Sequence, residues 1–299
     1  MKNAGRWLVL FAALALVAVA CGDDSAETTT TATSQPITTT TAAVTTTAAS
    51  STTAAGGVRS IDAVSAAITV DGDASDWAGI AGLDLTLNPI TGEEQIAAKP
   101  ATVKVAYDDE FLYLLLTVED DFNWDAADAH KSASSAVMWA IESGAGTGMG
   151  SDSDAKADEY NSLGMVDLWH WELECAAGSE TGGAVSDAGD GDLGNDAGCN
   201  FDDEWSTDPG SREDDNGAGA ENSLLGVFGH SNPVADGEGT WTFEIRRPLQ
   251  TGDATDFQVT AGQSALMGVA YWDADNSPEG WDDDEHVNSA IDGWIQVNF

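Results

Sequence analysis

The stretch Val103-Lys-Val-Ala-Tyr107, Asp108-Asp-Glu110, Phe111-Leu-Tyr-Leu-Leu-Leu-Thr-Val118 decides the fold class. Its first part alternates apolar and polar residues, its middle is a short acidic turn, and its last part is apolar at nearly every position. Two strand-like runs around a short turn predict a β-hairpin. Because the second run is apolar on both faces, we expect it to be a central, buried strand.

Short apolar runs elsewhere in the chain predict further strands. In residues 239–246, Trp241, Phe243 and Ile245 alternate with polar residues, which is the pattern of a strand with one buried face. The other expected strands are residues 67–70, 136–141, 166–173, 265–272 and 294–299. Many short strands separated by Gly and Asp turns predict an all-β domain, a β-sandwich with long acidic loops, over residues 58–299. Residues 176–220 lack periodicity, and we expect them to form a long loop.

The N-terminus indicates export. Lys2 and Arg6 precede an apolar run, residues 7–20, which is too short to be a typical membrane span. A basic start followed by an apolar run of this length predicts a signal peptide over residues 1–20.

Cys21 follows this run in the sequence Ala-Val-Ala-Cys, which resembles a bacterial lipobox. The resemblance implies that Cys21 becomes lipidated and anchors the exported protein to the outer face of the cytoplasmic membrane. The alternative is an ordinary cleaved signal with a chance Cys. Residues 21–57 are mostly Thr, Ser and Ala, a composition that predicts a disordered linker.

The other two cysteines are Cys175 and Cys199. With Cys21 lipidated, they form an even pair in an oxidising compartment, which predicts a disulfide that closes the acidic loop between them. The chain has no Cys-x-x-Cys-His motif, so covalent attachment of a c-type haem is excluded.

The charge of the chain limits its partners. The sequence has 10 basic and 52 acidic residues, and two of the basic residues lie in the signal peptide. Nucleic acids and anionic membrane surfaces both require a basic footprint, so neither is expected as a partner. The simplest interpretation of the acidity is that it keeps the protein soluble in a salty environment. The alternative interpretations are a docking surface for a basic redox partner and calcium binding.

Several motifs together resemble one known family, the ethylbenzene dehydrogenase-related haem-binding domain. The motifs are Val-Asp-Gly-x-x-x-Asp-Trp (70–77), Leu-Tyr-Leu-Leu-Leu (112–116), Met-Gly (149–150), Val-Asp-Leu-Trp-His-Trp (166–171), Trp-Thr-Phe-Glu-Ile-Arg-Arg-Pro-Leu (241–249) and Gly-Val-Ala-Tyr-Trp-Asp (268–273). The resemblance covers most of residues 65–299. It implies an immunoglobulin-like β-sandwich, close to family 9 carbohydrate-binding modules and to DOMON-type domains.

The resemblance also implies a cofactor, a non-covalent haem b. In this family a Met in a Met-Gly loop before the Trp-rich strand is one iron ligand, and Met149 matches it. A Lys in a Lys-x-x-Ser segment is the other, and here His286-Val-Asn-Ser289 has His286 in that place. Imidazole is a common haem ligand, so Met149 and His286 are the predicted pair.

Other residues have two interpretations each. Trp169 and Trp171 either stack on a porphyrin or a sugar ring or fill the core, and His170 points to the opposite side of their strand. Arg246 or its neighbour Arg247 either pairs with a haem propionate or forms a structural ion pair with Asp253 or Asp256.

Calcium is a second expected cofactor. Asp187, Asp190 and Asp192 offer carboxylates on a Gly-rich segment, as calcium prefers, although the spacing is not that of an EF-hand. Asp71, Asp73 and Asp76 form another acidic group, which ordinary turn chemistry also explains.

The sequence therefore predicts a membrane-anchored, extracytoplasmic b-type haem protein that transfers electrons, with a molybdenum oxidoreductase or a cytochrome as redox partner. The alternatives are a carbohydrate- or calcium-binding surface module and a structural envelope protein. Catalytic motifs of hydrolases, metalloproteases and nucleotide-binding enzymes are missing from the sequence, so we do not expect an enzyme.

Overall fold

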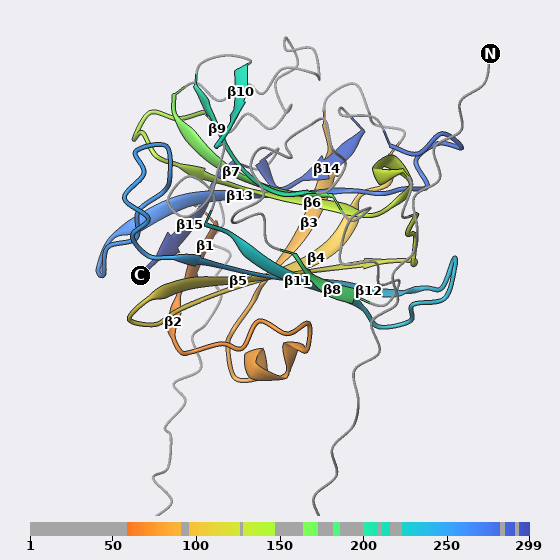
Figure 1. Ribbon diagram of the computed structural model, residues 1–299, viewed down its shortest axis with the longest axis horizontal. Coiled ribbons are helices and arrows are strands. Elements are labelled where there is room, and N and C mark those ends of the chain that lie inside the picture. The colour runs from red at the N-terminus through yellow and green to blue at the C-terminus, as the bar shows by residue number, and fades with distance from the viewer. Residues whose placement is uncertain are drawn as a thin grey trace, which may run out of the picture. The chain divides into compact units, whose positions relative to one another are not determined.

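Figure 1 shows the computed structural model of the chain. It describes residues 59–90, 96–125, 128–146, 164–172, 182–185, 200–207, 211–215, 223–281, 285–290 and 293–299. The predicted signal peptide and linker lie outside these ranges. Among the described residues, no helix is long and apolar enough to cross a membrane.

Two β-sheets pack face to face and form the upper and lower layers in Figure 1. The upper one, sheet A, contains β10 (Ser211–Asp214), β9 (Asn200–Thr207), β7 (Val166–Glu172), β6 (Ser134–Ala140) and β13 (Ser264–Trp272) in spatial order. Both β14 (His286–Asn288) and β15 (Ile295–Asn298) pair with the free side of β13, and β1 (Arg59–Asp62) lies parallel to β15. The all-β sandwich predicted from the sequence is confirmed.

The lower layer, sheet B, is built around the predicted hairpin. Its spatial order is β3 (Leu83–Pro89), β4 (Lys99–Tyr107), β5 (Phe111–Asp120), β12 (Gly239–Pro248), β11 (Leu225–His230) and β8 (Gly182–Val185). A short strand, β2 (Val64–Ser65), runs parallel to β4. The end of β3 pairs with β14, so β3 links the two sheets. Two short 3-10 helices, η1 (Ala74–Trp77) and η2 (Ala129–Lys131), complete the described elements.

The turn between β4 and β5 owes its shape to Asp108. Its Oδ1 accepts hydrogen bonds from the backbone N–H groups of Glu110 (2.8 Å) and Phe111 (2.7 Å). Its Oδ2 accepts one from the Tyr113 hydroxyl at 2.7 Å. An Asp that caps its own turn in this way stabilises a tight reversal of the chain. Strand β5 lies between β4 and β12, as its apolar character on both faces predicts.

Two sequence predictions about strands are wrong. Residues 67–70 are not a strand: Ile68 is buried because this segment covers the outer face of sheet B, where it packs with Trp77 and Leu115. Residues 176–220 are not one long loop, because they contain β8, β9 and β10. Strand β9 escaped detection because an inward position is occupied by Asp203 in place of an apolar residue.

Candidate functional site

Strand β7 presents its indoles and its imidazole to opposite sides of sheet A. Trp169 and Trp171 point into the space between the sheets and are 1% and 0% exposed. The ring of Trp171 lies edge-on to Phe243, with 5.5 Å between centroids, and to Phe228 at 6.0 Å. Of the two interpretations left open by the sequence, core packing is the one found, and neither indole offers an open face to a sugar ring.

Arg246 and Arg247 also point to opposite sides, because they are neighbours on β12. Arg246 lies on the outer face of sheet B, with its guanidinium carbon 4.7 Å from the centroid of the Phe111 ring. Arg247 points inward and is 1% exposed. It forms the structural ion pair with Asp256 that the sequence left open as an alternative. The buried member of the Arg pair is therefore Arg247 and not Arg246.

His286 lies on the outer face of sheet A and is only 5% exposed. Its ring packs against Trp272, its cross-strand neighbour, with 4.7 Å between centroids. Its Nε2 is 3.2 Å from the side-chain nitrogen of Asn288. The side-chain oxygen of Asn288 accepts from the backbone N–H of Ala290 at 2.9 Å, so the amide nitrogen of Asn288 is the group that faces the imidazole.

Three of the four histidines gather around two indoles on this face. His170 is 5.2 Å from Trp272 between centroids, and Trp272 is 5.8 Å from Trp281. His130 lies edge-on to Trp281 at 4.6 Å. We call His130, His170, Trp272, Trp281 and His286 the imidazole–indole cluster. Of these five residues, only His286 is a haem ligand predicted from the sequence, because the cross-strand pairing that brings the others to it is not a local pattern.

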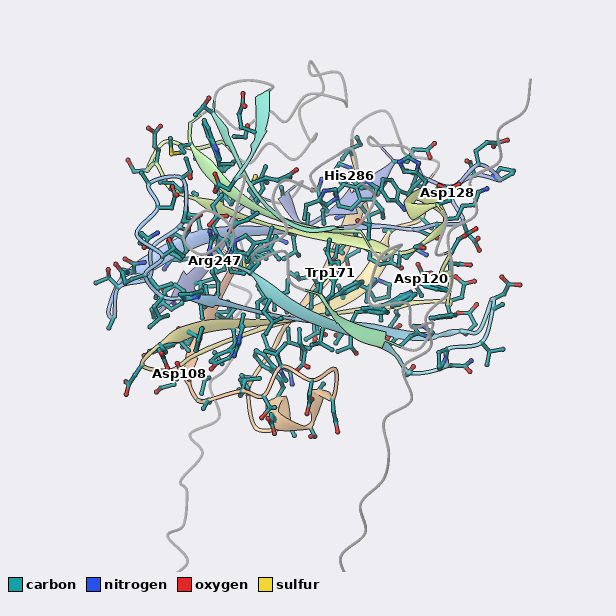
Figure 2. All side chains as sticks on the ribbon, viewed as in Figure 1. Asp108, Asp120, Asp128, Trp171, Arg247 and His286 are labelled. Atoms are coloured by element: carbon teal, nitrogen blue, oxygen red, sulfur yellow. The ribbon has the colours of Figure 1, made fainter. Side chains whose placement is uncertain are left out.

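The predicted haem residues do not form one pocket. Figure 2 shows Trp171 and Arg247 between the two sheets, whereas His286 lies on the far side of sheet A. Arg246 is on the outer face of sheet B. Met149, the other predicted iron ligand, lies outside the described residues.

Several other predicted residues lie outside the described ranges as well. They are the lipidation site Cys21, the cysteine pair Cys175 and Cys199, and the calcium candidates Asp187, Asp190 and Asp192. All of these stay predictions.

The acidic group in and just before η1 accepts hydrogen bonds from backbone N–H groups of its own segment. The Asp71 carboxylate accepts from the backbone N–H of Asp73, and the Asp73 carboxylate accepts from that of Ser75, both at 3.0 Å. The Asp76 carboxylate accepts from the N–H of Thr69 at 3.0 Å. The carboxylates are used by the local backbone, as turn chemistry predicts.

A polar groove of about 310 Å³ crosses strands β3, β4, β5 and β12 on sheet B. We call it the threonine groove; its lining side chains are Asp84, Pro100, Thr102, Thr117, Glu119 and Thr240. Cross-strand pairing aligns Asp84 with Thr102, and Thr102 with Thr117. The Thr102 hydroxyl donates to Asp84 Oδ1 at 2.9 Å. The groove is therefore an ordered array of hydroxyls and carboxylates that sequence reasoning missed, since each strand contributes only one or two of them.

Two carboxylate clusters are organised around a buried or half-buried basic residue. In the first, Lys99 Nζ lies 2.5 Å from both Asp120 and Asp273, and the Tyr271 hydroxyl donates to Asp120 at 2.8 Å. Burial and the neighbouring Asp273 raise the pKa of Asp120.

The second cluster lies between the sheets. Arg247 contacts Asp167 on β7 at 2.5 Å, Asp203 on β9 at 2.8 Å, and Asp256 after β12. We call these four residues the Arg247 cluster. Burial raises the pKa of Asp167 to about 6, and it raises that of Asp203 well above its usual value, against the opposing effect of the guanidinium.

No protein-family model matches this chain, and no curated protein matches it either. Solved structures with a similar course of the chain include a family 9 carbohydrate-binding module from Caldicellulosiruptor kristjanssonii. In complex with cellotriose it is 12% identical, covers 80% of this chain and 94% of its own, and gives a TM-score of 0.42. The same module in complex with glucose is 12% identical, covers 80% of this chain and 96% of its own, and gives a TM-score of 0.41.

A proposed carbohydrate-binding protein from Bacteroides uniformis is 10% identical, covers 81% of this chain and 100% of its own, and gives a TM-score of 0.38. The cellotriose and glucose are ligands of the Caldicellulosiruptor module. The likeness of these structures to the present chain concerns the sandwich fold. The haem-binding family resemblance stays a prediction, because no family model matches.

Proposed function

We propose that this protein is a non-catalytic, lipid-anchored surface module that binds a carbohydrate in the threonine groove. The observation that carries the proposal is the groove itself, with three Thr side chains and two carboxylates aligned across four neighbouring strands. Its volume of about 310 Å³ lies at the lower end of the range for ligand pockets, which suits one or two sugar rings.

The chemistry of the groove fits the hydroxyl groups of a sugar. Ionised Asp84 and Glu119 accept hydrogen bonds only, and the Thr hydroxyls both donate and accept. The ring of Pro100 offers a small apolar surface beside them. Because the lining is negative, we expect neutral or amino sugars to bind and uronic acids to be rejected.

Recognition in this groove relies on polar contacts. Among the described residues, Val234 is the only large apolar side chain that is well exposed. The indoles predicted to stack on a sugar are inside the sandwich. We therefore expect modest affinity for single sugars and a gain from multivalent display on the anchored linker.

The experiment is a glycan-array screen of the exported protein, followed by titration with the best glycan. Glu119→Gln and Asp84→Asn should each weaken binding about tenfold, the effect of losing one charged hydrogen-bond partner. Asp109→Asn, a change at an exposed carboxylate in the β4–β5 turn, is the matched control. Equal affinity of all three variants would reject the groove as the site.

A second candidate ligand is haem b, bound over the outer face of sheet A. The observation that favours it is that His286 is buried against Trp272 and does not lie on an exposed loop. The imidazole is a ligand type that haem iron takes, and Trp272 and Trp281, which are each 3% exposed, would have to move to admit the porphyrin. Trp169, Trp171 and Arg246 do not fit, because they lie on other surfaces.

A bound haem would supply one-electron chemistry, and a molybdenum oxidoreductase or a cytochrome would be the redox partner. In such a site His286 would hold the iron, with Met149 as the expected second ligand. The test is an absorption spectrum of the exported protein after addition of haemin. A Soret band that weakens in His286→Ala but not in His230→Ala supports haem binding, and a colourless protein excludes it.

A further inference from the structure

The Arg247 cluster has more negative charge than its single basic residue can balance. Asp167 and Asp203 are 0% exposed, Asp256 is 2% exposed and Arg247 is 1% exposed. Three carboxylates and one guanidinium give a formal charge of −2 on side chains that are almost completely buried. Buried charge of this kind requires a partner, either protons or a cation.

The donors of Arg247 are already used. Its Nη1 donates to Asp167 Oδ2 and its Nη2 to Asp203 Oδ2, while Nε donates to the Ser223 hydroxyl at 3.2 Å. The backbone N–H of Phe257 is bonded to the same oxygen of Asp167 at 2.8 Å. The other oxygens, Asp167 Oδ1 and Asp203 Oδ1, are buried and accept no hydrogen bond from any described residue. Unsatisfied buried carboxylate oxygens of this kind need an explanation, and an ion is one.

The spacing of the carboxylates suits a single ion. Asp167, Asp203 and Asp256 each offer one oxygen, and these three oxygens lie within 4.8 Å of one another. Calcium binds oxygen at about 2.3–2.6 Å, so two of its ligands are at most about 5 Å apart. We propose that the Arg247 cluster is a calcium site between the two sheets, formed by Asp167, Asp203 and Asp256.

The cluster has a route to solvent. Asp253 and Asp256 line a cavity of about 510 Å³ at the edge of the sandwich, together with residues of the β6 end and of the β13 start. Asp215 lies nearby and accepts hydrogen bonds from the Thr255 hydroxyl at 3.2 and 3.3 Å. Its carboxylate adds to the negative field that attracts a cation towards the cavity.

Protons compete for the same oxygens. Calcium binds ionised carboxylates, so its affinity falls as the carboxylates become protonated. Calcium binding must therefore be measured at pH 7.5 or above. The proposed ligands are different residues from the predicted calcium candidates Asp187, Asp190 and Asp192, and none of them lines the threonine groove.

The first experiment is titration of the full exported protein with calcium at pH 7.5, after removal of metals with EDTA. Asp203→Asn should lose one calcium per chain relative to the unchanged protein. The matched control is Asp109→Asn, an exposed carboxylate in the β4–β5 turn, which should keep the full number. The proposal is overturned if Asp203→Asn binds as many ions as the control.

A second experiment does not depend on removing a ligand. The guanidinium carbon of Arg247 is 5.6 Å from the centroid of the Trp169 ring, so an ion in the cluster lies close to an indole. Terbium, which replaces calcium, then emits light when the indole is excited. Trp169→Phe should keep the calcium count and lose a large part of this emission. Unchanged emission means that the ion binds at another place in the protein, and no rise in melting temperature with calcium at pH 7.5 means that protons alone balance the cluster. Either result refutes the proposal.

Discussion

Replacing Arg247 by Met tests the role assigned to the Arg247 cluster in holding the two sheets together. The variant keeps an unbranched apolar stem in place of the aliphatic part of Arg247 but leaves three buried carboxylates without their cation. Removing one partner of a buried ion pair costs about 3–5 kcal/mol. For a chain of this size, each kcal/mol corresponds to about 2–4 °C, so Arg247→Met should melt about 6–20 °C lower at pH 7.5. Urea unfolding in EDTA, followed by Trp fluorescence, measures the free energy directly.

The pH dependence of this loss separates charge from packing. Without the guanidinium, the three carboxyls can all become neutral as the pH falls, so the penalty should shrink between pH 7.5 and pH 4.5. Arg246→Met is the control, because Arg246 contacts the exposed side of Phe111 and should cost about 1 kcal/mol or less. The reasoning is refuted if the two variants lose equal stability at pH 7.5, or if the loss in Arg247→Met is the same at both pH values.

Three further predictions concern stability. In EDTA, the free energy of unfolding should fall as the pH rises through 6–7. Burial raises the folded-state pKa of Asp167 to about 6 and that of Asp215 to about 7. The stability that protonation of these two groups gives is therefore complete below about pH 4 and is lost above these pKa values. Asp215→Asn should flatten the upper part of a urea series from pH 5 to 8; an unchanged slope would contradict this. Trp171→Ala should lower the free energy of unfolding by about 3–5 kcal/mol in guanidinium unfolding. A loss below about 1 kcal/mol would contradict the full burial of Trp171 in the core. Glu244→Gln should cost about 1–3 kcal/mol in the same assay, because Glu244 accepts from the Trp77 indole and from two backbone N–H groups.

Local patterns in the sequence are sufficient to predict the hairpin and strand β12. The hairpin is defined by neighbours in sequence and by a turn that Asp108 caps. In β12 the alternation of Trp241, Phe243 and Ile245 gives the inward face directly. Continued by one more step, the same alternation places Arg247 inward and Arg246 outward. The sequence therefore contains the signal that separates the two arginines, and it assigns the buried ion pair to Arg247.

The missed features depend on contacts between distant segments. Strand β9 has Asp203 at an inward position, and only the presence of Arg247 on the other sheet makes that position acceptable. The apolar residues of 67–70 indicated a strand, but they pack on the outside of sheet B without pairing. The partners of His286 come from the register of β13 with β14, which no local pattern contains.

The balance of charge in the core explains why an acidic chain needs such clusters. The sequence has 52 acidic and 10 basic residues, so buried basic residues are shared among several carboxylates. Lys99 lies between Asp120 and Asp273, and Arg247 lies among three Asp residues. In each case the carboxylates outnumber the basic residue, and burial prevents water from screening the excess. The remaining charge must be met by protons or by a metal ion, which links the stability of this sandwich to pH and to divalent cations more directly than a purely apolar core would.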